Sequence, residues 1–255
     1  MKRNPSGTAT PTRVPFLQPV RTRQTVQDHV YTALRSALMT GRFDPGQVLT
    51  IDMLAHSFGV SHMPVREALR RLAAERALEP AANGSLLVPV ISLARLDDLV
   101  QARLAVETLA TERAARFMAP SGLKSLRVKM MAHAATTSEN GVEELLRRNQ
   151  EFHFQLYEAS GSEVYVSLIE ALWLRFGPYL RLLSRVIAPR LNDPDFGNGA
   201  QHHRAVVAGL EAGDATAATE AIAADIQATY ELLRPLICEL AETDPALGSE
   251  FVSAP

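Results

Sequence analysis

The sequence predicts a mainly α-helical protein in two parts: a helix-turn-helix with a β-hairpin, followed by an all-α bundle of six helices. The first observation is a turn followed by an amphipathic, arginine-bearing helix at 59–72. The second is a strand–turn–strand pattern at 78–90, and the third is a series of long helical runs after 92 without further strand signals. We expect an arm at 1–24, a first domain at 25–91, a helical domain at 92–244 and a tail at 245–255.

Length and composition are those of an ordinary water-soluble protein with two modest domains. The chain has 255 residues, 47% apolar and 21% charged. No run approaches the roughly 18 consecutive apolar residues of a membrane helix, and no apolar signal core follows the N-terminus. The single cysteine, Cys238, excludes an intrachain disulfide framework. We therefore expect a cytoplasmic protein with no membrane partner.

The net charge of −2 hides an asymmetry. Residues 1–90 hold 11 Lys and Arg against 6 Asp and Glu, a net charge of +5. The rest of the chain's 26 basic and 28 acidic residues, 15 and 22, give the remainder a net charge of −7. A basic head on an acidic body suits a protein that contacts a polyanion with one end.

The N-terminal residues are predicted to form the arm and the first two helices of the head. Residues 1–22 contain four prolines and only basic charges, as in a disordered arm that contacts phosphates or is simply a loose tail. Apolar residues at helical spacing predict a helix over 25–40, ended by Gly41. Thr50 can cap a second, short helix that reaches Phe58.

A third helix is predicted over 61–75. Gly59 supplies the turn, Ser61 can cap the helix, and apolar residues recur at i, i+3, i+4 and i+7 from Val65. His62, Arg66 and Arg70 then line one edge, and such an edge can lie in a major groove, where arginine grips guanine. The alternative is an amphipathic surface helix with solvated arginines.

A hairpin follows this helix. Two short apolar runs flank residues 81–85, which include the turn-forming pair Asn83-Gly84. An ordinary exposed hairpin would look the same, but its place directly after the arginine-bearing helix favours a wing with Gly84 at the tip. Past residue 92 the apolar spacing predicts six helices, over 93–118, 121–138, 142–160, 163–186, 199–212 and 215–242.

Several motifs in order resemble the winged helix-turn-helix of the GntR family of bacterial transcription regulators. They are Gly41-Arg-Phe-Asp-Pro-Gly46, Leu54-Ala55, Gly59-Val-Ser61 and Pro64-Val-Arg-Glu-Ala-Leu-Arg-Arg-Leu72. Arg66 matches the family's base-reading arginine. His62 and Met63 stand where arginine and threonine are common, and Asp52 stands where a DNA-contacting arginine is common. The resemblance implies DNA contacts by Ser61, His62, Met63, Arg66, Arg70 and Gly84.

The helical part resembles the FCD ligand-binding domain of one GntR subfamily. The matching pieces are Arg103-Leu-Ala-Val-Glu107, Phe152-His153, Ala159-Ser-Gly161, His203-Arg204-Ala205 and Gly213-Asp214. Many members hold a divalent metal with an aspartate and a histidine four residues apart and two later histidines. Those positions are Asn149, His153, His203 and Asp225 here, so the aspartate has become an amide and the last histidine a carboxylate.

Spacing brings these four residues together independently. Asn149 and His153 share a helix face. If Gly213-Asp214 joins two antiparallel helices, His203 and Asp225 lie about 15 and 18 Å from that turn, at about 1.5 Å per residue, and can meet. The set suits Zn²⁺, Ni²⁺, Mn²⁺ or Fe²⁺. The alternative is a metal-free polar pocket in which the histidines form hydrogen bonds.

Arg103 is the candidate effector-binding residue. Phasing its helix by Leu99, Val106 and Leu109 turns Arg103 toward the side of the bundle interior. There it can clamp a carboxylate or pair with Glu107 as a structural bridge.

These observations predict a transcriptional regulator and not an enzyme. A homodimer would bind an inverted repeat in double-stranded DNA, and a small organic or sugar acid in the bundle, bound with or without a metal, would change that affinity. A DNA-binding protein whose bundle only dimerises is the alternative. A metal enzyme is a further one, but no nucleophile or base motif accompanies the histidines and the DNA-binding head would be unexplained.

Overall fold

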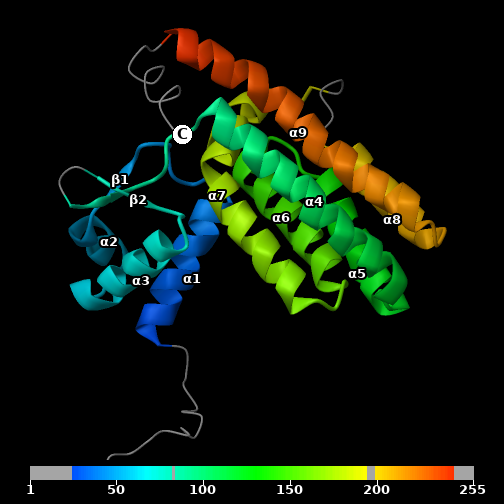
Figure 1. Ribbon diagram of the computed structural model, residues 1–255, viewed down its shortest axis with the longest axis horizontal. Helices are drawn as coiled ribbons and strands as arrows, with labels where there is room; N and C mark the ends of the chain where they lie inside the picture. Colours follow the sequence, from blue (N-terminus) through cyan, green and yellow to red (C-terminus); the bar gives the residue numbers. More distant parts are fainter. Residues whose placement is uncertain (1–24, 82–83, 194–198, 244–255) are drawn as a thin grey trace, which may run out of the picture.

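The computed structural model describes residues 25–81, 84–193 and 199–243. The expected N-terminal arm, Asn83 of the expected turn and the expected tail lie outside the described residues. Figure 1 shows the head, with α1–α3 and the strands, beside the helical bundle.

Three helices build the head. Helix α1 (Val26–Met39) begins with a reciprocal cap, in which the Thr25 side chain accepts a hydrogen bond from the Asp28 amide and the Asp28 carboxylate accepts one from the Thr25 amide. Helix α2 (Ile51–Phe58) is capped by Thr50, as the sequence predicts. Helix α3 (His62–Ala74) follows Gly59, which adopts a left-handed φ of 64° at the turn. The helix-turn-helix is thereby confirmed.

The hairpin is part of a larger sheet than the sequence predicts. Strands β2 (Glu79–Pro80) and β3 (Leu86–Leu87) pair antiparallel, and β1 (Val48–Leu49) pairs with the other edge of β3, giving the order β1-β3-β2. Val48 pairs with Leu87 and Leu49 with Leu86. A strand of two residues is too short to show an alternating hydrophobic pattern, so the sequence alone does not predict β1. It is recognised only by its pairing with β3.

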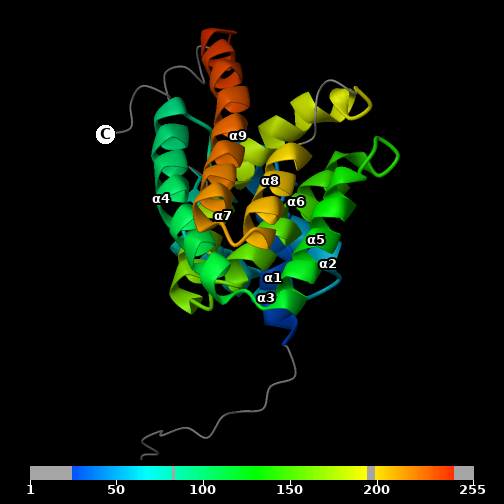
Figure 2. The ribbon, with the colours of Figure 1, turned by 90° about the vertical axis from the view of Figure 1, so that its right-hand side faces the viewer.

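Residues 93–193 and 199–243 form the expected bundle of six α-helices. They are α4 (Leu93–Phe117), α5 (Pro120–Ala134), α6 (Gly141–Glu158), α7 (Glu163–Ile187), α8 (Ala200–Glu211) and α9 (Ala215–Thr243), with a 3-10 turn η1 (Ala188–Arg190) after α7. Figure 2 shows α9 between α4 and α8, in agreement with its packing against both. Helix α5 ends four residues earlier than predicted, because the chain turns at Ala135.

The predicted phase of α4 needs one correction. Leu109 is 49% exposed, and the buried face instead includes Leu99, Arg103, Glu107 and Ala110. Arg103 does face the interior, but its neighbour on that face is an acid. The hydrophobic pattern of α4 gives the wrong phase because Arg103 and Glu107 occupy its buried face while the apolar Leu109 is exposed.

Helix α7 lies against the head as well as inside the bundle. A Cβ added at Gly177 would collide with the backbone carbonyl of Leu38 in α1, and one added at Gly41 would lie 2.6 Å from the backbone nitrogen of Arg181. Arg181 also donates to Asp44 at 2.6 Å. The head and α7 therefore contact each other through backbone as well as through ion pairs.

Candidate nucleic-acid interface and internal polar site

Helix α3 presents its charged edge to solvent. Its apolar residues Val65, Ala68, Leu69 and Leu72 are buried at 0–4% exposure, which fixes the opposite face outward. Met63 is 67% exposed, and Arg66 and Arg70 are exposed. Exposed cationic side chains on one edge of a helix can reach into a groove of DNA.

The strands complete this surface. His62, Arg66, Arg70 and Gly84 line one surface groove of about 580 Å³ between α3 and the end of the hairpin. Gly84 has a φ of +78°, and a Cβ added there would meet no atom within 4 Å. The hairpin therefore stands open at Gly84, where backbone can approach a partner closely.

Three polar details of this surface differ from the sequence prediction or add to it. Ser61 occupies the N-cap position, but its side chain makes no capping hydrogen bond, so its expected capping role is wrong. His62 Nε2 lies 3.2 Å from Asp52 Oδ1, with both side chains exposed. Arg70 bonds to Glu67, one turn earlier, through Nε at 3.2 Å to both carboxylate oxygens.

The bundle interior brings together His153 of α6, His203 of α8 and Asp225 of α9. His153 Nε2 lies 3.2 Å from Asp225 Oδ2 and 3.3 Å from His203 Nε2, and His203 Nε2 lies 3.8 Å from Asp225 Oδ1. One ligand atom from each residue falls within a 4.8 Å cluster. The turn at Gly213 allows α8 and α9 to run side by side, and the expected meeting of His203 and Asp225 follows.

Burial sets the charge of this cluster. Burial lowers the pKa of His203 well below its usual range, against the attraction of Asp225. Burial alone would raise the pKa of Asp225, but its hydrogen bond with His153 and the nearby His203 hold that pKa well below its usual range. A neutral imidazole and an ionised carboxylate are the protonation states that bind a metal ion.

The other ring nitrogen of His153 is held by a chain of buried polar groups. Nδ1 lies 2.9 Å from the Tyr157 hydroxyl, and that hydroxyl donates to Glu107. Glu107 also accepts from Arg103 Nε at 2.7 Å and from the Trp173 indole at 3.1 Å. Because the Tyr157 proton goes to Glu107, the Tyr157 oxygen can accept a hydrogen bond from Nδ1–H of His153, and that tautomer has a lone pair on Nε2. The hydrogen bond between His153 Nε2 and Asp225 Oδ2 needs a proton on Nε2, so the lone pair becomes available where a metal ion takes the place of that proton.

His153 and Asp225 of this cluster line a cavity of about 450 Å³, and His203 is buried behind them. Arg103 and Asn149, the remaining predicted residues of the bundle, also line it. Arg103 is 4% exposed and lies 4.5 Å from the Phe176 ring centre. Volume and mixed lining suit a small organic ligand.

Sequence reasoning missed His133 and Tyr157 as parts of the site; it named Glu107 only as the alternative partner of Arg103, a pairing that the structure contains. The His133 ring lies 4.5 Å from that of His203, and burial lowers its pKa to about 4. The available signals were a lone histidine in an apolar stretch, a tyrosine one turn after His153, and an acid one turn after Arg103. Each also fits an ordinary core position, and only the packing of α4, α5 and α6 relates them.

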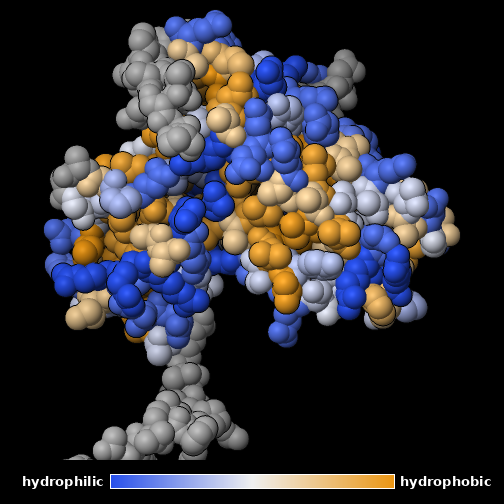
Figure 3. All heavy atoms as spheres, in the orientation of Figure 1, coloured by the Kyte–Doolittle hydropathy of each residue, from blue (hydrophilic) through white to orange (hydrophobic). Residues whose placement is uncertain are grey.

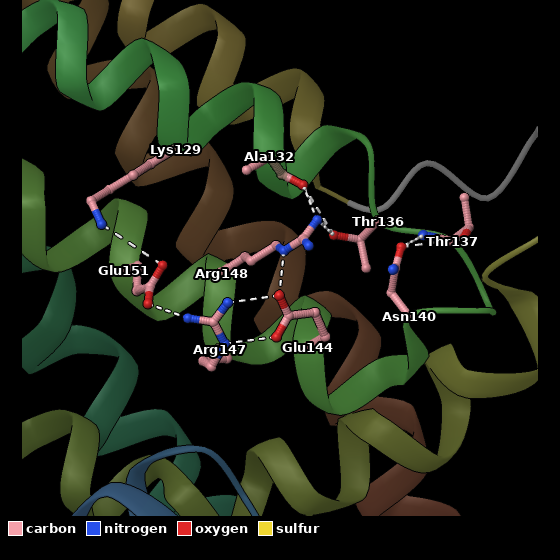
Figure 4. Close-up of polar contacts among 9 residues, drawn as sticks. All are labelled: Lys129, Ala132, Thr136, Thr137, Asn140, Glu144, Arg147, Arg148 and Glu151. Atoms are coloured by element: carbon pink, nitrogen blue, oxygen red, sulfur yellow. Dashed lines mark hydrogen bonds and ion pairs between the residues drawn. The ribbon is translucent and has the colours of Figure 1, made fainter.

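Arg148 fixes α5 against α6. Figure 4 shows its guanidinium between Glu144 of α6, at 2.6 Å, and the Ala132 carbonyl near the end of α5, at 2.7 Å. A second bond reaches Thr136 at 3.3 Å. An arginine on the last carbonyls of a helix satisfies acceptors that the helix itself leaves unpaired, and here it holds the turn of α5 that carries His133 in place.

Comparisons with known proteins agree with both halves of the chain. Residues 26–88 match the family of bacterial regulatory proteins, gntR family, and residues 98–228 match the FCD domain. The chain belongs to the GntR family. The transcriptional regulator McbR of Escherichia coli K12 is 28% identical over 200 residues, which cover 78% of this chain and 89% of McbR. The gluconate operon transcriptional repressor of Bacillus subtilis is 23% identical, over 71% of this chain and 74% of its own length.

Solved structures of GntR-family regulators share the fold. Escherichia coli McbR/YncC superposes with a TM-score of 0.77 at 27% identity, over 83% of this chain and 98% of its own. A GntR regulator from Rhodococcus sp. RHA1 gives 0.65 at 19% identity, over 81% and 96%. These matches make the protein a GntR-family transcriptional regulator with an FCD domain. In the part of the chain that the structure describes, no helix has the length and apolar character needed to cross a membrane.

Proposed function

We propose that this GntR regulator acts as a homodimer on an inverted repeat in double-stranded DNA, and that a small carboxylate effector in the bundle modulates its affinity. The observation that carries the proposal is one chain with both an exposed arginine edge on α3 and a buried histidine–carboxylate cluster, of which His153 and Asp225 line a 450 Å³ cavity. The first suits DNA, and the second suits a small ligand.

On the DNA side, Arg66 and Arg70 with the neighbouring His62 and Met63 would meet base edges, and Ser61 and the backbone at Gly84 would meet the sugar–phosphate chain. The Ser61 hydroxyl makes no capping bond and can donate to a phosphate oxygen. The groove between α3 and the hairpin gathers His62, Arg66, Arg70 and Gly84 on one surface. A single duplex can therefore meet all four.

On the effector side, His153, His203 and Asp225 would hold a divalent ion, Zn²⁺, Ni²⁺, Mn²⁺ or Fe²⁺, with Asn149 as a weaker fourth ligand. When bound, such an ion would attract the carboxylate of an effector. Arg103 bonds Glu107 through Nε and Nη2 and has further N–H groups for a carboxylate in the cavity. The Tyr157–Glu107 pair would keep His153 in the tautomer that leaves Nε2 open.

Helix α7 contacts both the cavity and the head. Trp173 and Phe176 line the cavity, and Arg181, one turn beyond Gly177, bonds Asp44 in the head. Arg35 of α1 reaches Glu170 of the same helix at 3.1 Å. An effector that favours one position of α7 would favour one position of the head, and DNA affinity would change by that difference.

The dimer would form on the outer face of α4 and α7. Figure 3 shows hydrophobic side chains gathered there, and Leu109, Phe117, Val164 and Leu168 are 48–66% exposed. An apolar face of this kind is typical of an interface, and a second copy fits because an inverted repeat needs two heads. Leu109→Glu with Leu168→Glu should give monomers by light scattering, and Lys124→Glu on α5 should not. Dimeric double-variant protein would contradict this interface.

Metal analysis tests the effector site. Protein purified without chelator should carry about one divalent ion per chain, His203→Ala should carry none, and His56→Ala, on the exposed head, should match the wild type. The wild type should then melt at a higher temperature with one of a panel of small organic and sugar acids, and that acid should change its affinity for a selected duplex. Protein without metal or ligand response would favour the alternative in which the bundle only dimerises.

A further inference from the structure

A second cavity, of about 300 Å³, lies where the head meets the bundle. The end of α3, strand β2 and Pro89 contribute from the head, and α4 and α7 contribute from the bundle. Its charged lining residues are Arg76, Glu79, Arg95 and Arg175. Figure 3 shows hydrophilic atoms in this region between the two parts. None of its lining residues belongs to the cavity beside His153.

Three arginines but only one acidic residue, Glu79, line this cavity. Arg95 Nη2 donates to Glu79 Oε1 at 2.8 Å, so the charges of these two residues cancel. Among the residues that the structure describes, Arg76 and Arg175 form no ion pair with any carboxylate. Arg175 is half-buried, so part of its hydration has been lost. The lining of the cavity thus has a net charge of +2, with Arg175 half-buried and Arg76 exposed at its edge.

The backbone gives a second, independent observation at Arg76. Its φ is 57°, and it is the one non-glycine residue with a positive φ in the described parts of the chain. It follows the C-cap of α3, where glycine or asparagine is the usual residue because a side chain strains the left-handed conformation. An arginine at this position costs backbone strain that glycine would avoid, so local backbone geometry does not explain its presence.

We propose that this cavity binds a compact oxyanion, the phosphate or carboxylate group of a small molecule, between Arg76 and Arg175. Guanidinium groups bind such oxyanions through paired N–H donors. Arg76 stands at the end of α3 opposite to Ser61, His62 and Arg66, so the ligand is a small molecule and not the duplex that those residues face. Because Arg76 belongs to the head and Arg175 to α7, the bound anion would link the two parts.

Inorganic phosphate is the probe, titrated into the full-length protein without DNA at constant ionic strength. The wild type should show a saturable rise in melting temperature of about 3–6 °C at roughly ten times its Kd. Arg175→Gln and Arg76→Gly should each weaken the apparent affinity about tenfold. Arg76→Gly is the sharper variant because glycine accepts the positive φ, so the fold is kept while the charge is lost.

Arg204→Gln on α8 is the matched control. It removes one exposed arginine that lines neither cavity and should respond to phosphate as the wild type does. The same rise in all four proteins would mean a general salt effect and would overturn the site. Absence of a saturable rise in the wild type, with weaker duplex binding by Arg175→Gln, would instead assign these arginines to DNA and overturn the small-molecule ligand.

Discussion

Two histidine–aspartate pairs in this protein have the same N–O distance and opposite surroundings. His62 and Asp52 on the head lie 3.2 Å apart with side chains 61% and 86% exposed. His153 and Asp225 in the bundle also lie 3.2 Å apart, but are 1% and 12% exposed. Water can replace the first pair at little cost, whereas the second must be satisfied by protein groups or a cation. The two pairs differ in burial and not in distance. The exposed pair on the head can exchange its partner for water or DNA, whereas the buried pair in the bundle cannot.

The largest expected effect tests this contrast on two arginine–glutamate pairs. Glu107→Ala leaves Arg103 buried without its partner and should lower the free energy of unfolding by about 3–5 kcal/mol. Glu67→Ala, which removes the exposed partner of Arg70, should leave it unchanged. Urea unfolding followed by helical circular dichroism, at equal protein concentration, measures both. Replacing the buried pair together, Arg103→Met with Glu107→Leu, should recover much of the loss; similar losses at both sites would contradict the comparison.

Acid should destabilise the bundle through its buried histidines. The pKa of His133 is about 4 in the folded protein, against 6.5 for a histidine exposed to water, so the unfolded chain binds more protons between these values. Its contribution is full above pH 6.5 and is lost as pH falls toward 4, up to about 3 kcal/mol, and His203 acts in the same direction. His133→Gln should flatten the stability–pH curve in this window, while exposed His56→Gln should not. An unchanged slope in His133→Gln would show that its titration is not linked to folding.

On the head, a substitution should change recognition without changing stability. Arg66→Ala should weaken binding to a selected duplex by about 1–3 kcal/mol and relax the base preference at one position. Its free energy of unfolding should stay within error, because the side chain is exposed and bonds to no described residue. Fluorescence anisotropy with matched and substituted duplexes measures this, and Arg204→Ala is the control. Unchanged discrimination between the duplexes would remove Arg66 from the reading surface.

The smallest expected effect concerns Asp52. Its carboxylate stands on the DNA-facing side beside His62 and would repel phosphates, so Asp52→Asn should raise affinity about two- to fivefold at low salt, equally for matched and unrelated duplexes. Asp98→Asn, an equal charge change on exposed α4, should have no effect. A gain restricted to one sequence would mean that Asp52 reads bases.

Local signals carried most of the fold prediction. Thr50 caps α2, Gly59 turns the chain before α3, and Gly213 ends α8, and each acts on its own neighbours. Strand β1 escaped because Val48 and Leu49 form a strand only through pairing with β3. Leu109 misled the phase of α4 because the inner face of that helix contains the Arg103–Glu107 pair, which a hydrophobic pattern cannot register.

The sequence by itself determined the helices, their order, the exposed edge of α3 and the spacing that lets His203 meet Asp225, because these follow from contacts within a few turns of chain. The tertiary structure alone decided that Glu107 and Tyr157 brace His153, that His133 joins the cluster, and that Arg76 and Arg175 share a cavity. Those residues lie on different helices, and charge and burial act through space. Their protonation and pairing therefore depend on distances that only the packed chain sets.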